Sequence, residues 1–270
     1  MPRPEPYLAE DLTGKIALIT GASSGFGLAV SWRLAEAGMK LILVARRQER
    51  LDALAAELLE ACGTITHVVC LDVRDTTKCE NLVSTLPAEF QQVDLLINNA
   101  GLALGTASAG DNDISEMRTM LETNVLSVMA LSKSVLKVMI PRNSGQIINV
   151  GSTAGHSAYP GGSGYTASKF ALRAYTESMR MDLCATNIRI SLISPGAVET
   201  EFSLVRFKGD EARAAKVYEG LAKLTAVDIA DNILYMATRP ARVQIHDLVV
   251  SSVHQASSTL TARPLQPLPQ

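Results

Sequence analysis

A tyrosine and a lysine four residues apart form the most reactive pair of side chains in this sequence. They are Tyr165 and Lys169, in the stretch YTASK. On a helix, residues at this spacing share one face. A free tyrosine with a pKa near ~10 is a poor base at neutral pH, but a neighbouring ammonium lowers that pKa electrostatically. The pair is therefore suited to exchanging a proton with a substrate oxygen.

A glycine-rich turn near the N-terminus predicts a second kind of chemistry. The apolar stretch KIALIT (15–20) runs into TGASSGFG (20–27), and the helical pattern LAVSWRLAEAG follows. Glycines in such a turn let the backbone approach a pyrophosphate, and the N-terminus of the following helix offers unpaired N–H groups. This order of strand, turn and helix predicts a dinucleotide site. Its residues are Gly21, Ser23, Ser24, Gly25, Phe26 and Gly27.

Two arginines indicate which dinucleotide binds. The second apolar stretch, KLILVA (40–45), ends directly before Arg46 and Arg47. At this position an acidic residue accepts a hydrogen bond from the ribose 2′-hydroxyl of NAD, whereas arginine binds the 2′-phosphate of NADP. The sequence therefore favours NADP(H). Arg47 alone is equally well explained as a solvated residue at the start of the next helix.

Seven short apolar stretches alternate with amphipathic ones, which predicts an α/β fold of the Rossmann type. The expected strands are 15–20, 40–45, 64–70, 93–98, 145–150, 188–194 and 246–250. Such a pattern is typical of a doubly wound parallel sheet with helices on both faces. Residues 47–60 have helical spacing and Gly63 is their expected stop. Ligands of such sheets bind outside the carboxyl ends of the strands.

The chain length of 270 residues is consistent with a single α/β domain. We expect an N-terminal arm (1–13), a catalytic domain (14–253) and a C-terminal tail (254–270). Residues 200–226 interrupt the strand and helix alternation and are interpreted as a lid. The tail is rich in proline and polar residues, so it is either disordered or laid across a neighbouring subunit.

Together with the glycine turn, several motifs make the chain resemble the short-chain dehydrogenase/reductase family over roughly residues 13–250. Tyr165 and Lys169 match its YxxxK motif. The other matching residues, in the family's order, are Asn98, Asn99, Ala100 and Gly101, then Asn124, Ser152, and Pro195 with Gly196. The resemblance implies reversible, metal-free hydride transfer at a CH–OH group. In this chemistry Tyr165 would act as acid/base and Ser152 would orient the substrate oxygen.

The same resemblance implies roles for further residues. Lys169 would also hold the nicotinamide ribose. Asn124 would fix a water that relays protons to Lys169, although a satisfied buried polar group is the alternative. Asp72, with Val73 beside it, would contact the adenine, and Asn99 would lie against the adenosine ribose. The nicotinamide would be bracketed by Pro195, Gly196, Val198 and Thr200. A homotetramer, formed through the helices after the fourth and fifth strands, is also implied.

Within the family, the chain most resembles the NADP-dependent 3-hydroxy acid dehydrogenases, which act on serine and allo-threonine. The stretches that carry this are LVARRQERL, AYPGGSGYTASK, the segment from PGAVETEF to KVYEG, and the late HQASS. A carboxylate would be bound by Arg206 or Lys208, and His156 and Tyr159 are further substrate candidates. Two alternatives remain: a reductase of bulkier ketones or aldehydes, and a non-catalytic NADP-binding sensor.

Composition narrows the function classes. The net charge is −2, 19% of residues are charged and 47% are hydrophobic, which is typical of a globular protein without a nucleic-acid surface. We expect no signal peptide, no apolar stretch near the ~18–20 residues of a membrane span, and a cytoplasmic location. Cys62, Cys70, Cys79 and Cys184 lack the clustering of metal sites and are expected to be free thiols.

Overall fold

The computed structural model describes residues 9–220 and 223–263. Its centre is one seven-stranded sheet with the order β3-β2-β1-β4-β5-β6-β7, and every neighbouring pair is parallel. The predicted Rossmann-type sheet is confirmed, with strand ends that differ by no more than two residues. The strands are β1 (Ile16–Thr20), β2 (Lys40–Ala45), β3 (Thr66–Cys70), β4 (Leu95–Asn98), β5 (Gly145–Val150), β6 (Ile188–Pro195) and β7 (Asp247–Val250).

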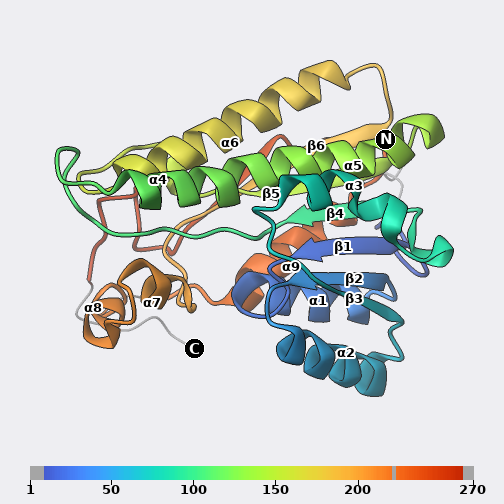
Figure 1. Cartoon of the computed structure of the whole chain (residues 1–270), viewed down its shortest axis with the longest axis horizontal. Coiled ribbons are helices and arrows are strands. Elements are labelled where there is room, and N and C mark those ends of the chain that lie inside the picture. The colour runs from blue at the N-terminus through green and yellow to red at the C-terminus, as the bar shows by residue number, and fades with distance from the viewer. Residues whose placement is uncertain (1–8, 221–222, 264–270) are drawn as a thin grey trace, which may run out of the picture.

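Helices cover both faces of the sheet, which is why the central strands are mostly apolar. One face carries α1 (Gly25–Glu36), α2 (Gln48–Cys62) and α9 (Ala226–Ala237). The other carries α3 (Thr76–Thr85), α5 (Ser127–Arg142) and α6 (Ser163–Asp182), as Figure 1 shows. Each face has its own core: Leu34 and Ile233 belong to the first, Leu131 and Met179 to the second.

The helix predicted over 47–60 is α2, and it ends where the sequence indicates. Gly63 has φ 67°, the left-handed conformation that favours glycine, and its N–H donates to the carbonyls of Leu58 and Leu59. This is a common way for a helix to end, since it satisfies carbonyls that lack intrahelical partners.

One stretch is longer and more apolar than expected. Helix α4 (Ile114–Leu121), a π-helical turn (Glu122–Leu126) and α5 run on continuously over 29 residues, long and apolar enough to cross a membrane. The expectation that no such stretch exists is therefore wrong. However, 61% of its most apolar part is buried inside the protein, where it packs against α3 and α6. Burial in the core accounts for its composition.

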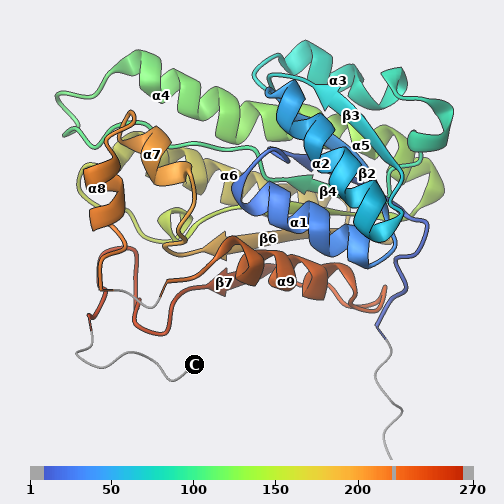
Figure 2. The same ribbon diagram turned by 90° about the horizontal axis from the view of Figure 1, so that it is seen from below.

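The predicted lid forms two short helices beyond the carboxyl ends of the strands. They are α7 (Phe202–Arg206) and α8 (Glu211–Lys216), and Figure 2 shows them together at one end of the molecule. Lys208, between them, forms an ion pair with Glu116 of α4. The lid therefore lies over the end of the sheet where ligands of this fold bind.

The described part of the C-terminal tail packs on its own chain. We had expected the tail either to be disordered or to lie across a neighbouring subunit. Gln255 pairs with Thr261 as an antiparallel bridge, so residues 254–262 form a short hairpin. The hydroxyl of Ser258 donates to the carbonyl of Ser157. Residues 264–270 lie outside the described part of the chain. We refer to residues 254–262 as the C-terminal hairpin.

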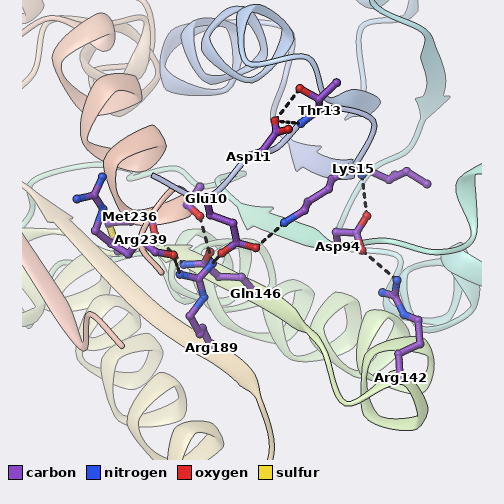
Figure 3. A network of polar contacts seen from close by, with 12 residues as sticks. Glu10, Asp11, Thr13, Lys15, Asp94, Arg142, Gln146, Arg189, Met236 and Arg239 are labelled. Atoms are coloured by element: carbon purple, nitrogen blue, oxygen red, sulfur yellow. Dashed lines mark hydrogen bonds and ion pairs between the residues drawn. The ribbon is translucent and has the colours of Figure 1, made fainter. Parts of the chain in front are cut away.

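The amino end of the sheet is held by a network of charged side chains, drawn in Figure 3. Glu10 accepts hydrogen bonds from Lys15 and Arg189 and so joins the residues before β1 to β6. Asp94, at the start of β4, accepts from the Ile16 backbone N–H and from Arg142 of α5. These contacts tie the N-terminal segment, the sheet and a helix together on the side remote from the lid.

Candidate active site

A cavity of about 500 Å³ opens at the carboxyl ends of the strands. The glycine turn after β1 and the end of β2 form one part of its wall, and the lid and the C-terminal hairpin form another. A volume of this order is common in small-molecule sites, which usually measure roughly 300–1,000 Å³. The residues that could carry chemistry therefore share one enclosed space.

The glycine turn is shaped to receive a group against its backbone. Gly21 and Gly25 have φ angles of 68° and 54°, which strain any other residue. A Cβ on Gly27 would lie 2.3 Å from the carbonyl oxygen of Gly21, so only glycine lets α1 pack this closely on the turn. The helix N-terminus faces the cavity, and these residues fit a dinucleotide pyrophosphate.

The end of β4 stabilises the same turn. The Asn99 side chain donates to the carbonyl of Thr20 at 2.7 Å. In return, the Thr20 hydroxyl accepts from the backbone N–H groups of Asn99 and Ala100 at 3.0 and 2.9 Å. The predicted adenosine neighbour Asn99 thus also locks the ends of β1 and β4 into one wall of the cavity.

The two arginines after β2 differ in their surroundings. Arg47 lies across the glycine turn and donates to the hydroxyls of Ser24 (2.7 Å) and Ser23 (3.1 Å) and to the Glu201 carboxylate (3.0 Å). Arg47 is therefore more than a solvated first residue of α2. The exposed Arg46 guanidinium makes no hydrogen bond to another described residue and lines the cavity. Both are placed where a 2′-phosphate would need cations.

Asp72 follows the third strand, and its carboxylate is already paired with a neighbouring arginine. The Asp72 carboxylate accepts from the Arg74 guanidinium, and this hydrogen bonding holds the pKa of Asp72 below its usual value. Arg46 adds a weaker electrostatic effect in the same direction. Asp72 is consequently an ionised hydrogen-bond acceptor beside the arginines at physiological pH.

Tyr165 is buried where the catalytic residues converge. Burial raises the pKa of Tyr165, while a hydrogen bond with Ser152 and the positive charge of Arg206 lower it. The ring of Phe202, on α7, packs edge-on against the Tyr165 ring with centroids 5.6 Å apart. The Ser152 hydroxyl caps the short helical turn Thr153–Gly155 by accepting from Ala154 N–H. That cap directs Ser152 toward the phenol.

Lys169 lies close to Tyr165, and burial disfavours its charged form. Its Nζ donates to the Val150 carbonyl at 2.8 Å and lies 5.9 Å from the centre of the Tyr165 ring. Burial lowers the pKa of Lys169 to about 8, because the charged form is poorly solvated there. That the ammonium lowers the pKa of Tyr165 stays a prediction. Ser152 and Arg206 act in that direction, but burial outweighs them and raises the pKa of Tyr165 overall.

Asn124 lies in the π-helical turn and is fully hydrogen-bonded. Its Oδ1 accepts from the Leu102 N–H, and its Nδ2 donates to the Leu102 carbonyl and to the Ser168 hydroxyl. It is only 1% exposed and does not line the cavity. Its side chain therefore acts as a brace between the loop after β4 and helix α6, and its expected role in a proton relay stays a prediction.

Comparison with known proteins agrees with this geometry. The family model described as short chain dehydrogenase matches residues 15–210. The chain belongs to the short chain dehydrogenase family. It is 44% identical over 248 residues to the NADP-dependent 3-hydroxy acid dehydrogenase of Schizosaccharomyces pombe, covering 92% of this chain and 96% of that protein. It is 43% identical over 244 residues to sulfoacetaldehyde reductase 2 of Chromohalobacter salexigens, covering 90% and 96%.

A solved structure shows the same relation in three dimensions. The closed form of a serine dehydrogenase complexed with NADP+ superposes with a TM-score of 0.85 at 40% sequence identity. The match covers 92% of this chain and 99% of that one. This short chain dehydrogenase therefore shares its overall fold with an enzyme solved with NADP+.

Arg206 is the lid residue that enters the dehydrogenase site. Its guanidinium carbon lies 5.5 Å from the ring centre of Tyr159 and 5.9 Å from that of Tyr165, and Nη1 donates to the Tyr159 hydroxyl at 3.2 Å. Its Nε is buried and has no hydrogen-bond partner within the described chain. The alternative cation, Lys208, is instead paired with Glu116 outside the cavity.

Most residues predicted for this dehydrogenase do line the cavity. Four do not: Gly27 and Asn124, which pack behind it, Lys208, which is paired with Glu116, and His156. The His156 Nε2 lies 3.1 Å from both the Ser194 hydroxyl and the Asp247 carboxylate, so contact with substrate would require it to leave them. The predicted residues that line the cavity are Gly21, Ser23, Ser24, Gly25, Phe26, Arg46, Arg47, Asp72, Val73, Asn99, Ala100, Gly101, Ser152, Tyr159, Tyr165, Lys169, Pro195, Gly196, Val198, Thr200 and Arg206.

Sequence reasoning missed several residues of the dehydrogenase cavity, among them two at the start of the lid and two in the C-terminal hairpin. Glu201 and Phe202 begin the lid, and Gln255 and Ser258 belong to the C-terminal hairpin. The stretch HQASS, which contains Gln255 and Ser258, supported the resemblance without being given a role. No spacing rule links residues so far apart, because only the return of the chain after β7 brings them to the site.

Proposed function

We propose that this protein is an NADP-dependent dehydrogenase that transfers a hydride reversibly between NADP(H) and a small 3-hydroxy acid such as serine or allo-threonine. The observation that carries the substrate class is Arg206, which lines the cavity beside Tyr165. Its Nε is buried and has no hydrogen-bond partner among the described residues. A buried cation without an ionic partner is costly, so an anionic ligand is the natural complement.

The names of the relatives support an anionic substrate. They describe a 3-hydroxy acid dehydrogenase, a serine dehydrogenase and a sulfoacetaldehyde reductase. Each of these compounds carries a carboxylate or a sulfonate near the reacting carbon. A guanidinium forms strong, charge-assisted hydrogen bonds with either group. We assign the substrate carboxylate to Arg206, with the Tyr159 hydroxyl as a neighbouring donor.

The cofactor would be held by the residues around the glycine turn and the strand ends. The turn would receive the pyrophosphate, Arg46 and Arg47 the 2′-phosphate, and Asp72, Val73 and Asn99 the adenosine. Pro195, Gly196, Val198 and Thr200 would surround the nicotinamide, with Ala100, Gly101 and Lys169 at its ribose. When bound, NADP+ accepts a hydride from the alcohol carbon and NADPH returns one to the carbonyl carbon.

Proton transfer is the task of the chain's own residues. In alcohol oxidation the Tyr165 oxygen takes the hydroxyl proton, and in carbonyl reduction it gives one back. Ser152 donates a hydrogen bond to the reacting oxygen and stabilises the charge that develops there. Lys169, whose pKa burial lowers to about 8, can release a proton near neutral pH. The Asn124 side chain already makes its hydrogen bonds within the protein. The water of the proposed proton relay would therefore be bound by the backbone of Asn124.

The alternative of a reductase for bulkier ketones receives less support. An apolar substrate would leave the buried Arg206 Nε without a hydrogen-bond acceptor, which is unfavourable. A non-catalytic sensor is likewise disfavoured, since Ser152, Tyr165 and Lys169 all line one cavity.

We further propose a homotetramer formed through α4, α5 and α6. Exposed apolar side chains support this interface: Leu121 and Leu126 lie where α4 passes into α5, and Phe170 lies on α6. Burying such side chains between subunits is favourable. Sedimentation of the purified protein would measure the assembly. A cytoplasmic location stays a prediction that cell fractionation can test.

The function is tested by following NADPH formation with L-serine, L-allo-threonine and 3-hydroxypropionate, with NADP+ and NAD+ in parallel. Propan-1-ol, which lacks the carboxylate, is the matched control substrate. We expect turnover of the acids with NADP+ and much less with NAD+ or propan-1-ol. Activity confined to apolar alcohols would contradict the substrate class, and a preference for NAD+ would contradict the role of the arginines.

A further inference from the structure

The C-terminal hairpin places a buried glutamine against the backbone that follows β6. Gln255 is 9% exposed, and its side-chain Oε1 accepts from the Ala197 N–H at 2.8 Å. A backbone N–H can only donate, so this contact fixes the orientation of the amide. The carbonyl faces Ala197, and the NH₂ group is left for the cavity that Gln255 lines.

The neighbouring glycine allows this approach. A Cβ on Gly196 would lie 2.2 Å from the Gln255 Oε1 and 3.1 Å from the Cβ of Ser251. A Cβ there would displace the Gln255 side chain from its place beside the loop. Gly196, expected to face the nicotinamide on one side, is therefore also packed against Gln255 on the other.

The hairpin that carries Gln255 is itself held firmly. The Gln255 N–H donates to the Ser252 carbonyl, and the Gln255 carbonyl accepts from the Ser251 hydroxyl. At its tip, Ser258 donates to the carbonyl of Ser157, in the loop that follows Ser152. The hairpin thus connects the loop of the catalytic serine with the loop after β6.

Three backbone groups of the loop 195–198 have specific partners. The Gly196 N–H donates to the Val250 carbonyl at 2.7 Å, and the Val198 carbonyl accepts from the Tyr218 hydroxyl at 2.9 Å. The Ala197 N–H lies between them and has the Gln255 side chain as its acceptor. Loss of that acceptor would leave a half-buried donor unpaired in the middle of the loop, and a shift of the loop would relieve it.

We propose that Gln255 is a positioning residue for the nicotinamide end of the cofactor site, acting through its hold on the Ala197 N–H. The inference rests on the proposed function only in that NADP(H) is the ligand, and it is independent of the substrate. The adenosine end of the site, at β1 to β3, makes no use of this contact. Gln255 should therefore matter for one half of the cofactor and not for the other.

Calorimetric titration with NADPH and with 2′,5′-ADP separates the two halves, because 2′,5′-ADP carries the 2′-phosphate and lacks the nicotinamide. In Gln255→Met, which keeps the size and removes the acceptor, we expect NADPH to bind about tenfold more weakly, as one lost hydrogen bond would cause. Binding of 2′,5′-ADP should stay within about twofold. Gln92→Met, at an exposed site before β4, is the matched control and should change neither affinity.

Gln255→Glu tests which end of the amide acts. It keeps an oxygen for the Ala197 N–H and replaces the NH₂ group, so we expect most of the NADPH affinity to return. If it weakened NADPH binding as much as Gln255→Met does, the amide would act through its NH₂ group and the proposal would be wrong. Equal weakening of NADPH and 2′,5′-ADP would also overturn it, since it indicates a general structural defect.

Gly196→Ala provides a second route if Gln255→Met fails to fold. Its Cβ would push Gln255 away while leaving the glutamine in the sequence, so the same selective loss of NADPH affinity is expected. Unchanged NADPH binding in Gly196→Ala would contradict the proposal. A wild-type protein that bound 2′,5′-ADP but not NADPH would instead contradict the proposed function, which keeps the two failures distinguishable.

Discussion

The two ends of the sheet use charged side chains in opposite ways. At the amino end, Glu10 meets Lys15 and Arg189, and Asp94 meets Arg142, so each charge has an ionic partner (Figure 3). At the carboxyl end, the Lys169 Nζ faces the Val150 carbonyl, and the Arg206 Nε is buried without a hydrogen bond within the described chain. The same residue types thus stabilise one end and leave the other ready to bind.

The difference has a physical cause. A charge matched by its partner keeps its usual protonation state and contributes to stability, whereas a buried charge without a partner has a shifted pKa and attracts a ligand of opposite sign. Lys169 and Tyr165 show the shifts, both caused chiefly by burial. Substitutions at the carboxyl end should therefore change activity, and those at the amino end should change stability.

The largest effect is expected for Tyr165→Phe, which removes the proton donor and acceptor and leaves the ring in place. General acid and base catalysis is worth roughly 10²–10⁴-fold, and we expect kcat to fall by about 10³ or more. Steady-state kinetics with NADP+ and L-serine measure it. Tyr235→Phe, at an exposed tyrosine, is the control. Substantial turnover by a folded Tyr165→Phe enzyme would mean that another group moves the proton.

Arg206→Met should come next, because it removes the cation proposed for the substrate carboxylate. A charge-assisted pair in a buried site is worth about 10²-fold, so kcat/KM for 3-hydroxypropionate should fall by that order. Activity toward propan-1-ol should change far less. Arg213→Met, which removes a lid arginine that packs on Phe207, is the control. Equal losses with both substrates would show that Arg206 supports the lid only.

The pH dependence should reveal the buried lysine. Burial favours the neutral form of Lys169 and lowers its pKa from 10.5 to about 8, so below that pH the site holds a proton that alcohol oxidation must displace. We expect kcat/KM for NADP+ in the oxidation direction to rise about tenfold per pH unit below ~8 and then level off. Lys169→Arg stays charged and should lose this inflection. A profile that is flat across neutral pH in the wild-type enzyme would contradict the assignment.

The smallest effect is expected at the amino end, where Asp94→Asn removes a charge opposite Arg142 and keeps an oxygen for the Ile16 N–H. For a partly exposed pair the free energy of unfolding should fall by about 1 kcal/mol, which lowers Tm by about 2–4 °C. Thermal melts and kcat should be measured together, with Asp182→Asn as the control. A fall in kcat at unchanged Tm would contradict the idea that charges at the amino end of the sheet serve stability rather than activity.

Several features were predictable because they depend on neighbours in the chain. The apolar runs predicted all seven strands, and the spacing of Gly21, Gly25 and Gly27 predicted the turn that we propose receives the phosphates. Tyr165 and Lys169 were found because one helical turn separates them. These inferences rest on periodicity and backbone sterics, which operate over a few residues.

Other features could not be read in the same way. The sequence left Arg206 and Lys208 as equal candidates for the carboxylate, and the fold separates them, since Lys208 reaches Glu116 while Arg206 turns to Tyr159. His156 was expected beside the substrate and is bound to Ser194 and Asp247 instead. In each case a partner from a distant segment decides where the side chain lies.

By itself, then, the sequence determined the sheet, the glycine turn, the cofactor preference and the Tyr165–Lys169 pair, because local spacing and residue type are enough for each. Only the tertiary structure decided that burial lowers the pKa of Lys169 to about 8. It also decided that Gln255 returns to the loop after β6. Burial and long-range contacts exist only once the chain has folded, so local patterns along the sequence do not predict them.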